Sequence, residues 1–360
     1  MSIVAENVDL AMGIDVAAKH LAITVMSSGS VLKQATIAHT RPAIESFLAR
    51  FPGCHIRAAY EAGCFGYWLH DTLVELGVMV TVTPPSLLER APGERVKTDR
   101  RDSVKLAEQL GAGRLKAVAI PSKEERATRQ LVRTYEQLKQ TRVQAMVRIR
   151  SFLEFHHIEV PPEAGRKWTG AFVGWLETFG FEGMAGPEYL RRSLDALVHV
   201  YLDLTGQVGQ FKKEIGRLAK TKRYERAVTV LESTRGVGTL SAMTVLVETR
   251  NVRRFATSQE FVSNLGLVPS EHSTGDARHQ GHITRTGNRH IRGILVECAW
   301  TWIRYDEAAY AVYRRIARRR EPKRAIVAMA RRLAVKMYWQ LRQIHFGERS
   351  ARSARAEDAA

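Results

Sequence analysis

Four acidic residues in the first third of the chain could together hold divalent metal ions. Asp15 lies inside an apolar stretch, Glu61 ends another, and Asp99 and Asp102 are three residues apart where an amphipathic stretch begins. A carboxylate inside a buried strand is costly unless it is paired or metal-bound, and its oxygens suit Mg²⁺ or Mn²⁺. Two such ions about 4 Å apart would stabilise the attacking and the leaving oxygen of a phosphodiester. The simpler alternative for Asp15 is a residue that caps a turn at a strand end.

Basic residues surround the second pair of acids, and the whole chain is strongly basic. Lys97, Arg100 and Arg101 adjoin Asp99 and Asp102, so they could hold the anion on which a metal acts. The chain has 55 Lys and Arg against 37 Asp and Glu, a net charge of +18, which favours a polyanionic partner such as nucleic acid. No apolar run is long enough to span a bilayer, and the N-terminus lacks a signal peptide's basic start. We therefore expect a cytoplasmic protein that binds nucleic acid and no membrane.

Residues 1–120 contain the elements that must position these acids. Their hydrophobic pattern alternates strands and helices in the order β-β-β-α-β-α-β-α, with a turn at 27–29, and this order is typical of a ribonuclease-H-like α/β domain. In such a sheet the first and fourth strands are neighbours, so Asp15 and Glu61 should lie side by side. The helix that begins near Asp99 and Asp102 should pack over them with both acids on one face.

Residues 121–225 carry an apolar heptad pattern. Ser122 and Glu125 form a capping box that opens a long helix. A second stretch, residues 190–218, alternates steps of four and three between nine apolar residues without interruption. We expect a coiled-coil arm, either a helical hairpin or a dimerising helix, with a small apolar knob or loop near residues 161–180. The alternative is the ordinary core of a helical bundle.

Residues 226–348 are expected to form a compact, mostly helical domain, followed by a flexible tail at 349–360. Its segment RGVGTLSA is similar to the turn of a helix-hairpin-helix, in which Gly236 and Gly238 would bring backbone N–H groups to a phosphate. A plain glycine turn explains the pattern equally well. Residues 314–336 hold ten cations against one acid, and we expect their helices to bind the nucleic-acid backbone. The residues expected to do so include Arg318, Arg319 and Arg320.

A long polar stretch at residues 266–295 joins two apolar helices and is rich in glycine and basic residues. Long loops of this kind in compact domains are often functional. Ser273 and Thr274 offer hydroxyl groups there, and Arg278 and Arg285 could stabilise an oxyanion. For any single serine in a loop, a turn residue is the simpler explanation.

Taken together, these motifs resemble those of the DEDD insertion-sequence transposases, the family that includes the Piv DNA invertases and the bridge-RNA-guided recombinases. The matching stretches follow the family's order between about residue 12 and residue 300, and they read GIDVAAKH, YEAG, KTDRRDS, RGVGTLSA and PSEHSTGDARHQGHITRTGNRHIR. The resemblance implies a RuvC-like domain, a coiled-coil arm and a mostly helical C-terminal transposase domain. It also implies that Asp15, Glu61, Asp99 and Asp102 bind metal.

The resemblance further implies a site-specific recombinase in which a serine of the polar loop attacks a DNA phosphate covalently. Ser273 is the expected nucleophile because its primary hydroxyl is less hindered, although Thr274 holds the place directly before Gly275, where relatives often have their serine. Relatives use a non-coding bridge RNA that pairs with donor and target DNA. A bacterial, nucleoid-associated homo-oligomer, a dimer or a tetramer with a composite site, is therefore expected.

Two other functions fit the same residues. A structure-specific nuclease, similar to a Holliday-junction resolvase, would use the carboxylates and a water molecule, so Ser273 and Thr274 would be dispensable. A non-enzymatic nucleic-acid-binding scaffold would use only the heptads and the basic helices, so the four carboxylates could be replaced without loss.

Overall fold

A computed structural model of the chain describes residues 8–88, 98–165, 167–271 and 280–357. The chain divides into two compact units, Met1–Ser122 and Lys123–Ala360. Lys97, Ser273, Thr274 and Arg278 lie outside the described residues, so their roles stay predictions. Among the helices that the structure describes, none is long and apolar enough to cross a membrane.

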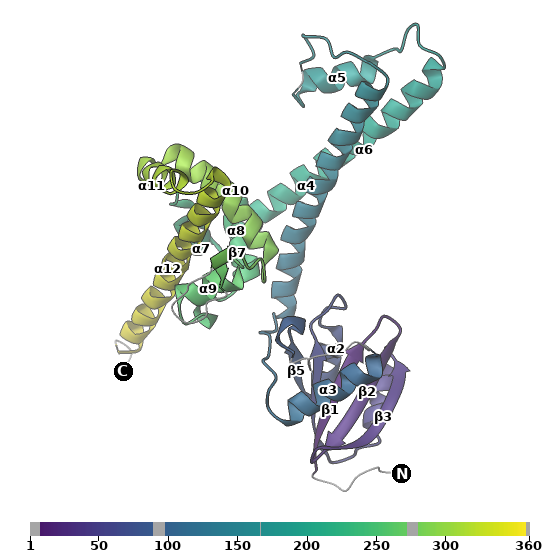
Figure 1. Cartoon of the computed structure of the whole chain (residues 1–360), viewed down its shortest axis with the longest axis vertical. Helices are drawn as coiled ribbons and strands as arrows, with labels where there is room; N and C mark the ends of the chain where they lie inside the picture. Colours follow the sequence, from purple (N-terminus) through teal and green to yellow (C-terminus); the bar gives the residue numbers. More distant parts are fainter. Residues whose placement is uncertain (1–7, 89–97, 166, 272–279, 358–360) are drawn as a thin grey trace. The chain divides into compact units, whose positions relative to one another are not determined.

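The first unit contains a five-stranded sheet in the order β3-β2-β1-β4-β5 (Figure 1). β1, β2 and β3 are antiparallel neighbours, whereas β4 is parallel to both β1 and β5. The turn between β2 and β3 has positive φ angles at Ser28 and Gly29, which is the geometry of a two-residue hairpin. The order of elements agrees with the ribonuclease-H-like prediction. The strands are β1 Asp9–Val16, β2 His20–Ser27, β3 Ser30–Ala38, β4 His55–Glu61 and β5 Met79–Thr83.

Helices cover both faces of this sheet. Alternate residues of β1, among them Met12 and Ile14, share a core with α1 and α2 on one face. The opposite face carries Ala11 and Gly13 and is covered by α3, whose Leu110 packs against Ala11. The helical segments are α1 Arg41–Leu48, α2 Trp68–Glu75, the 3₁₀ turn Pro85–Leu87 and α3 Asp99–Gly111.

The second unit begins with an antiparallel pair of long helices, α4 (Lys123–Phe155) and α6 (Pro187–Ala219). The start of α4 shares one core with the end of α6, and the opposite ends share another core with α5 (Gly170–Thr178), where the apolar knob is predicted (Figure 1). All nine heptad residues of α6 belong to these cores, but so do Val198 and Ala219 beside them. The apolar stripe is wider than a coiled-coil seam and suits a helix with several neighbours. The coiled-coil arm stays a prediction.

The remaining helices contribute to one core together with α8, in which residues 242–249 are all buried. β6 and β7 form an antiparallel pair between α9 and α10, so the stretch 266–295 is not one loop but contains a strand pair and the start of α10. α12 extends through residues 349–357, for which the sequence predicts a tail, and the many Ala and Arg residues there favour helix. The elements are α7 Glu225–Glu232, α8 Thr239–Thr249, the 3₁₀ turn Val252–Arg254, α9 Ser258–Asn264, β6 Pro269–Glu271, β7 Gln280–Ile283, α10 Arg289–Tyr305, α11 Glu307–Ala317 and α12 Pro322–Glu357.

Candidate active site

Gly13 allows helix α3 to lie directly on strand β1. A Cβ atom at this position would overlap the carbonyl oxygen of Ser103 and the backbone nitrogen of Ala107, so any other residue would displace the helix. The position that a Cβ of Gly13 would take and the side chain of Asp15 are on the same face of the sheet, because side chains alternate along a strand. The glycine therefore determines how closely α3 can approach the end of β1 that carries Asp15.

A chain of polar side chains fixes the start of α3 on the sheet. The hydroxyl oxygens of Thr24 and Ser103 are 2.8 Å apart, and Ser103 also donates to the Arg100 carbonyl oxygen at 2.9 Å. Gln34 Nε2 donates to the Thr24 hydroxyl at 3.3 Å, and Arg100 Nε donates to Gln34 Oε1 at 2.6 Å. Arg100 is thereby held at the surface of the sheet, and its contact with nucleic acid stays a prediction. Arg101 is exposed on the next position of the helix.

Asp15 and Glu61 lie side by side at the carboxyl ends of two neighbouring parallel strands. Ile14 of β1 is paired with Tyr60 of β4, so the next residue of each strand is an acid. Both acids are half-buried, and their position in the strand alternation puts them on the face that α3 covers. Ligands of open α/β sheets bind at this edge of the sheet.

Asp99 and Asp102 occupy the first turn of α3. Thr98 caps the helix by accepting a hydrogen bond from Arg101 N at 3.3 Å, and the positive end of the helix dipole favours carboxylates here. Asp99 Oδ2 lies 3.2 Å from His20 Nε2, and Asp102 Oδ1 lies 3.8 Å from Lys105 Nζ. His20 is not among the residues predicted from the sequence, although it ends the matching stretch GIDVAAKH.

The four carboxylates supply the donor chemistry for a hard divalent ion but not a formed ligand shell. Asp15 and Glu61 share one edge of the sheet, and a shallow cleft of about 670 Å³ borders the start of α3, lined by His20, Asp99 and Arg100 among others. Within the described residues, no three His, Cys, Asp or Glu side chains lie close enough together to hold a metal ion. Carboxylate oxygens are the type of ligand that Mg²⁺ and Mn²⁺ prefer, and the acids share one side of the sheet. The metal site and its four ligands stay predictions.

Two glycines seat the strand pair of β6 and β7 near the end of α9. Gly266 and Gly287 have positive φ angles, and a Cβ atom at either would overlap a backbone carbonyl oxygen of the facing segment. The strand pair flanks residues 272–279, which include the predicted nucleophile Ser273. Arg285 lies between the two glycines and is exposed with a φ of 55°. Its role at an oxyanion stays a prediction.

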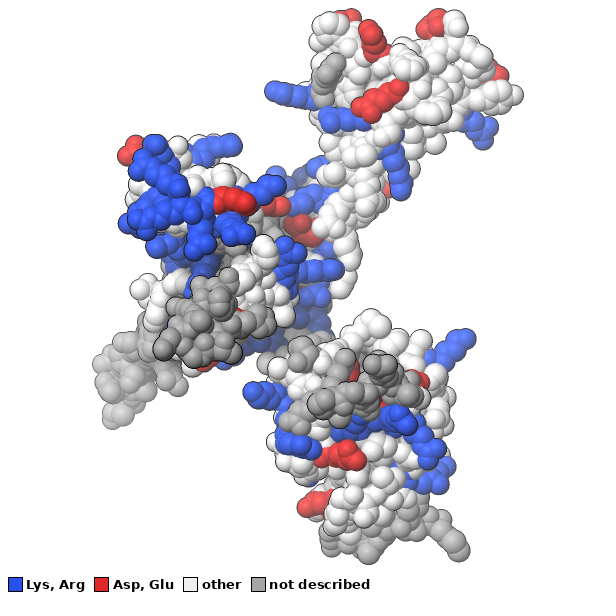
Figure 2. Space-filling model, viewed as in Figure 1, with Lys and Arg blue, Asp and Glu red and all other residues white. Residues whose placement is uncertain are grey.

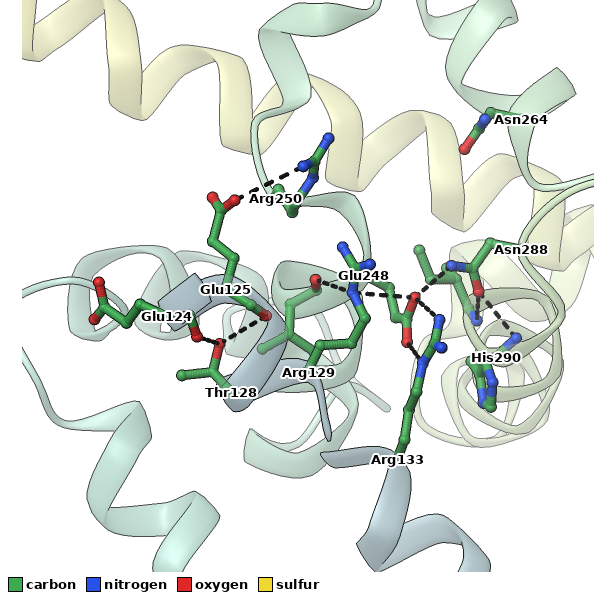
Figure 3. A network of polar contacts seen from close by, with 12 residues as sticks. Glu124, Glu125, Thr128, Arg129, Arg133, Glu248, Arg250, Asn264, Asn288 and His290 are labelled. Carbon is green, nitrogen blue, oxygen red and sulfur yellow. Dashed lines mark hydrogen bonds and ion pairs between the residues drawn. The ribbon is translucent and has the colours of Figure 1, made fainter. Parts of the chain in front are cut away.

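Following this strand pair in the chain, the N-terminal end of α10 is tied to a buried carboxylate, Glu248 of α8 (Figure 3). Arg133 of α4 donates two hydrogen bonds to it, from Nε to Oε1 at 2.6 Å and from Nη2 to Oε2 at 2.9 Å. Asn288 Nδ2 donates to Oε2 at 2.6 Å, and Asn288 Oδ1 accepts from two N–H groups of the first turn of α10. Arg129 Nε lies 3.8 Å from Oε2. We call these four residues the Glu248 network.

Burial and the neighbouring charged groups determine the protonation states of Glu248 and of the nearby His290. Burial would raise the pKa of Glu248, but the hydrogen bonds and charge of Arg133, with smaller contributions from Asn288 and Arg129, outweigh it and lower the pKa below its ordinary value. For His290, in the first turn of α10, burial lowers the pKa more than the nearby Glu248 raises it. Glu248 is therefore ionised and His290 neutral at neutral pH.

The predicted phosphate-binding turn and the predicted nucleic-acid-binding arginines lie in different parts of the second unit. Gly236 has a positive φ, and its Cα lies against the backbone of α10, so close packing already requires a glycine there. Gly238 is the N-cap of α8 and faces open space.

The segment between α11 and α12 is exposed, and Figure 2 shows Lys and Arg gathered over this region. The binding roles of these residues stay predictions; the exposed segment contains Arg318, Arg319 and Arg320.

Two family models and several known proteins match much of the chain. A model described as the transposase IS116/IS110/IS902 family matches residues 228–314, and a model for DEDD transposases of the IS110 type matches residues 12–158. A Sinorhizobium fredii protein provisionally named a transposase is 33% identical over 306 residues, which cover 83% of this chain and 73% of that protein. The transposase for insertion sequence element IS1533 of Leptospira borgpetersenii is 25% identical over 346 residues, which cover 92% and 96%. The chain belongs to the IS110/IS116/IS902 family of transposases, and its N-terminal part is of the DEDD type.

Proposed function

We propose that this transposase of an IS110-family insertion sequence cuts and rejoins DNA through the four carboxylates of its first unit and a serine hydroxyl of its second. Family membership supports DNA as the substrate. The observation that carries the proposal is the pairing of β1 with β4, which makes Asp15 and Glu61 neighbours on the face where Gly13 seats α3. A scaffold without chemistry has no use for four acids beside a polyanion, because they would repel its phosphates.

The carboxylates would hold the divalent ion on which the DEDD type depends. Asp15, Glu61, Asp99 and Asp102 are the proposed ligands, and a bound Mg²⁺ or Mn²⁺ would neutralise charge on the phosphodiester. Arg100, held by Gln34 at the sheet surface, would bind the DNA strand together with its neighbours Lys97 and Arg101. A carboxylate set of this kind is equally able to serve a nuclease, so the hydroxyl nucleophile distinguishes the two functions.

Ser273 would supply that nucleophile. Its Oγ forms a bond to the DNA phosphorus, the P–O bond to one DNA end breaks, and that end leaves as a hydroxyl after taking up the serine proton. The phosphoserine retains the phosphodiester bond energy, so attack by another DNA end rejoins the strand and releases the serine. Arg278 and Arg285 would stabilise the charge that develops on the phosphate oxygens. Thr274 is the alternative nucleophile.

A suicide DNA substrate tests the covalent step. Its cleaved end diffuses away, so the wild-type protein should be trapped as a protein–DNA band on a denaturing gel. Ser273→Ala should lose this band and Thr274→Ala should keep it; the reverse result moves the nucleophile to Thr274. Cleavage without any covalent band, by both variants, would support the nuclease.

Asp102→Asn tests the carboxylates. This variant should lose strand cleavage in Mg²⁺ while its affinity for DNA stays close to that of the wild type, because one neutralised acid removes a repulsion and leaves the cationic groups that bind DNA in place. Glu108→Gln is the matched control, since it neutralises an exposed acid of the same helix. Full cleavage by Asp102→Asn would refute the proposed role.

A guide RNA and a homo-oligomer complete the proposal. A net charge of +18 suits an RNA bound together with donor and target DNA. RNA that co-purifies with the protein should pair with both DNA partners when sequenced, and its removal by ribonuclease should abolish recombination. Recombination by RNA-free protein would contradict the guide role. Light scattering on the active complex should give the mass of a dimer or a tetramer.

A further inference from the structure

Three aromatic side chains are exposed on α10 and at the start of α11, and the proposed reaction uses none of them. Trp300 is 46% exposed, Tyr305 57% and Tyr310 47%. The ring of Tyr310 stacks on that of Tyr313, with centres 6.4 Å apart and planes inclined by 24°, and Trp300 lies 6.0 Å from Tyr313. We call these four residues the aromatic face. Clustered exposed rings of this kind mark binding surfaces, whereas single ones need no explanation.

An open cleft of about 850 Å³ passes Tyr305 and Tyr310. Arg235 lines it and donates from Nη1 to the Tyr305 carbonyl oxygen at 2.7 Å, and Arg304 also lines it. The guanidinium carbon of Arg314 lies 5.8 Å from the centre of the Tyr310 ring. Positive charge therefore borders flat apolar rings along one surface.

The acidic residues that line the cleft do not make this surface acidic. Asp306 caps α11 by accepting a hydrogen bond from Ala309 N at 2.9 Å, and it accepts another from Trp302 Nε1 at 3.0 Å. These bonds turn the carboxylate toward the protein. Glu307 remains as the second acid of the lining, while the exposed arginines that follow along α11 keep the surroundings basic, as Figure 2 shows over this helix.

We propose that the aromatic face binds single-stranded DNA by stacking on its unpaired bases. Ring stacking needs the flat faces of bases, which a duplex hides between neighbouring base pairs, leaving only base edges and backbone in reach. The bordering arginines contact the phosphates of the same strand. The inference rests on the proposed function, since cutting and exchanging strands exposes unpaired DNA.

A second copy of this chain fits the same surface less well. A two-fold contact places one surface against itself, so the arginines of the two copies would face each other. Arg314 and Arg315 belong to the helix that carries Tyr310, and both are exposed. Single-stranded DNA offers flat bases to the rings and an anionic backbone to the arginines, whereas a second copy would offer rings but place arginines against arginines.

Fluorescence of a short single strand that contains 2-aminopurine tests the proposal on the full chain. Stacking on a tyrosine should quench the analogue, and titration gives the Kd. Tyr310→Leu keeps an apolar side chain without the ring, so it should reduce the quenching and weaken binding roughly tenfold, as expected when one base stack is removed. Tyr310→Phe should bind like the wild type. Tyr189→Leu is the matched control, because Tyr189 is 71% exposed on α6, outside the aromatic face.

Each further outcome is decisive. Unchanged quenching and Kd in both Tyr305→Leu and Tyr310→Leu would overturn the inference, whereas cleavage by Asp102→Asn decides the proposed function separately. Quenching with single-stranded RNA and none with DNA would show that the occupant is wrong. A loss of self-association in the tyrosine variants, with DNA binding unchanged, would make the surface an interface between copies.

Discussion

Replacing Arg133 by methionine should destabilise the second unit by about 3 kcal/mol. The change removes two hydrogen bonds and leaves the Glu248 carboxylate, 1% exposed, without its main counter-charge. Breaking a buried ion pair by removing one partner costs about 3–5 kcal/mol. The lower end applies because Arg133 is itself 38% exposed and Asn288 continues to donate to Glu248.

A second substitution separates the cost of the abandoned charge from the cost of poorer packing. The double variant Arg133→Met, Glu248→Met should be more stable than Arg133→Met alone by about 1–2 kcal/mol, because no carboxylate is then left buried without its partner. It should not regain full stability, since Asn288 loses its acceptor. Arg148→Met is the matched control, an exposed arginine of the same helix, and should change stability by no more than about 0.5 kcal/mol.

Urea unfolding followed by tryptophan fluorescence measures these effects. Every tryptophan except Trp68 lies in residues 123–360, so the signal reports mainly on the second unit. The free energies follow from the transition midpoints and slopes. Stability of Arg133→Met within about 0.5 kcal/mol of the wild type, or a double variant no more stable than the single one, would refute the dependence of Glu248 on Arg133.

Three more predictions concern the seat of α3, the basic surface and the Glu248 network. Gly13→Ala should lift α3 from the sheet and cost about 3 kcal/mol, seen as faster hydrogen exchange in residues 99–111, whereas Gly111→Ala, whose Cβ meets only an ordinary contact, should not. Replacing the exposed arginines between α11 and α12 together by alanine should lower the slope of log affinity against log salt on duplex DNA by about 0.9 for each phosphate that the variant no longer binds, and an unchanged slope would show that this surface does not touch DNA. Because the folded pKa of Glu248 lies below its ordinary value of 4.5, the network's charge stabilises the fold above that pH and the contribution disappears as the pH falls through the lower folded pKa. The urea midpoint of the wild type should therefore drop more steeply in acid than that of Glu248→Gln, and parallel curves would contradict this.

Much of the first unit could be predicted from the sequence because its local patterns are strong. Strand alternation in β1 is regular enough to predict which face of the sheet carries Asp15. The order of elements makes β4 the neighbour of β1, so the position of Glu61 beside Asp15 can be predicted without any knowledge of packing. The strand pair of β6 and β7 could not be predicted. Its strands have three and four residues, contain Pro269 and Gly281, and have Ile283 as their only apolar side chain apart from the proline.

The candidate site was predictable only as far as backbone topology determines it. The contact of His20 with Asp99 and that of Arg133 with Glu248 join residues far apart in the chain, and no local pattern encodes which distant polar groups meet. Glu248 did carry one signal, since it is a single acid in an otherwise apolar or small-polar helix, α8. That is the same signal that identified Asp15; for Glu248 the partner is Arg133, and for Asp15 the metal ion stays a prediction.

Because α3 packs on β1, the first unit can complete its fold only after α3 has been synthesised. The ribosome releases Asp15 and Glu61 well before residues 99–111, and domains assemble from the N-terminus as the chain emerges. Until α3 arrives, the face of β1 at Gly13 has no cover and the acids at positions 99 and 102 do not exist. The proposed nucleophile at position 273 is made later still. Under the proposed function, a nascent chain would therefore lack the complete set of acids and the nucleophile until most of it has been made.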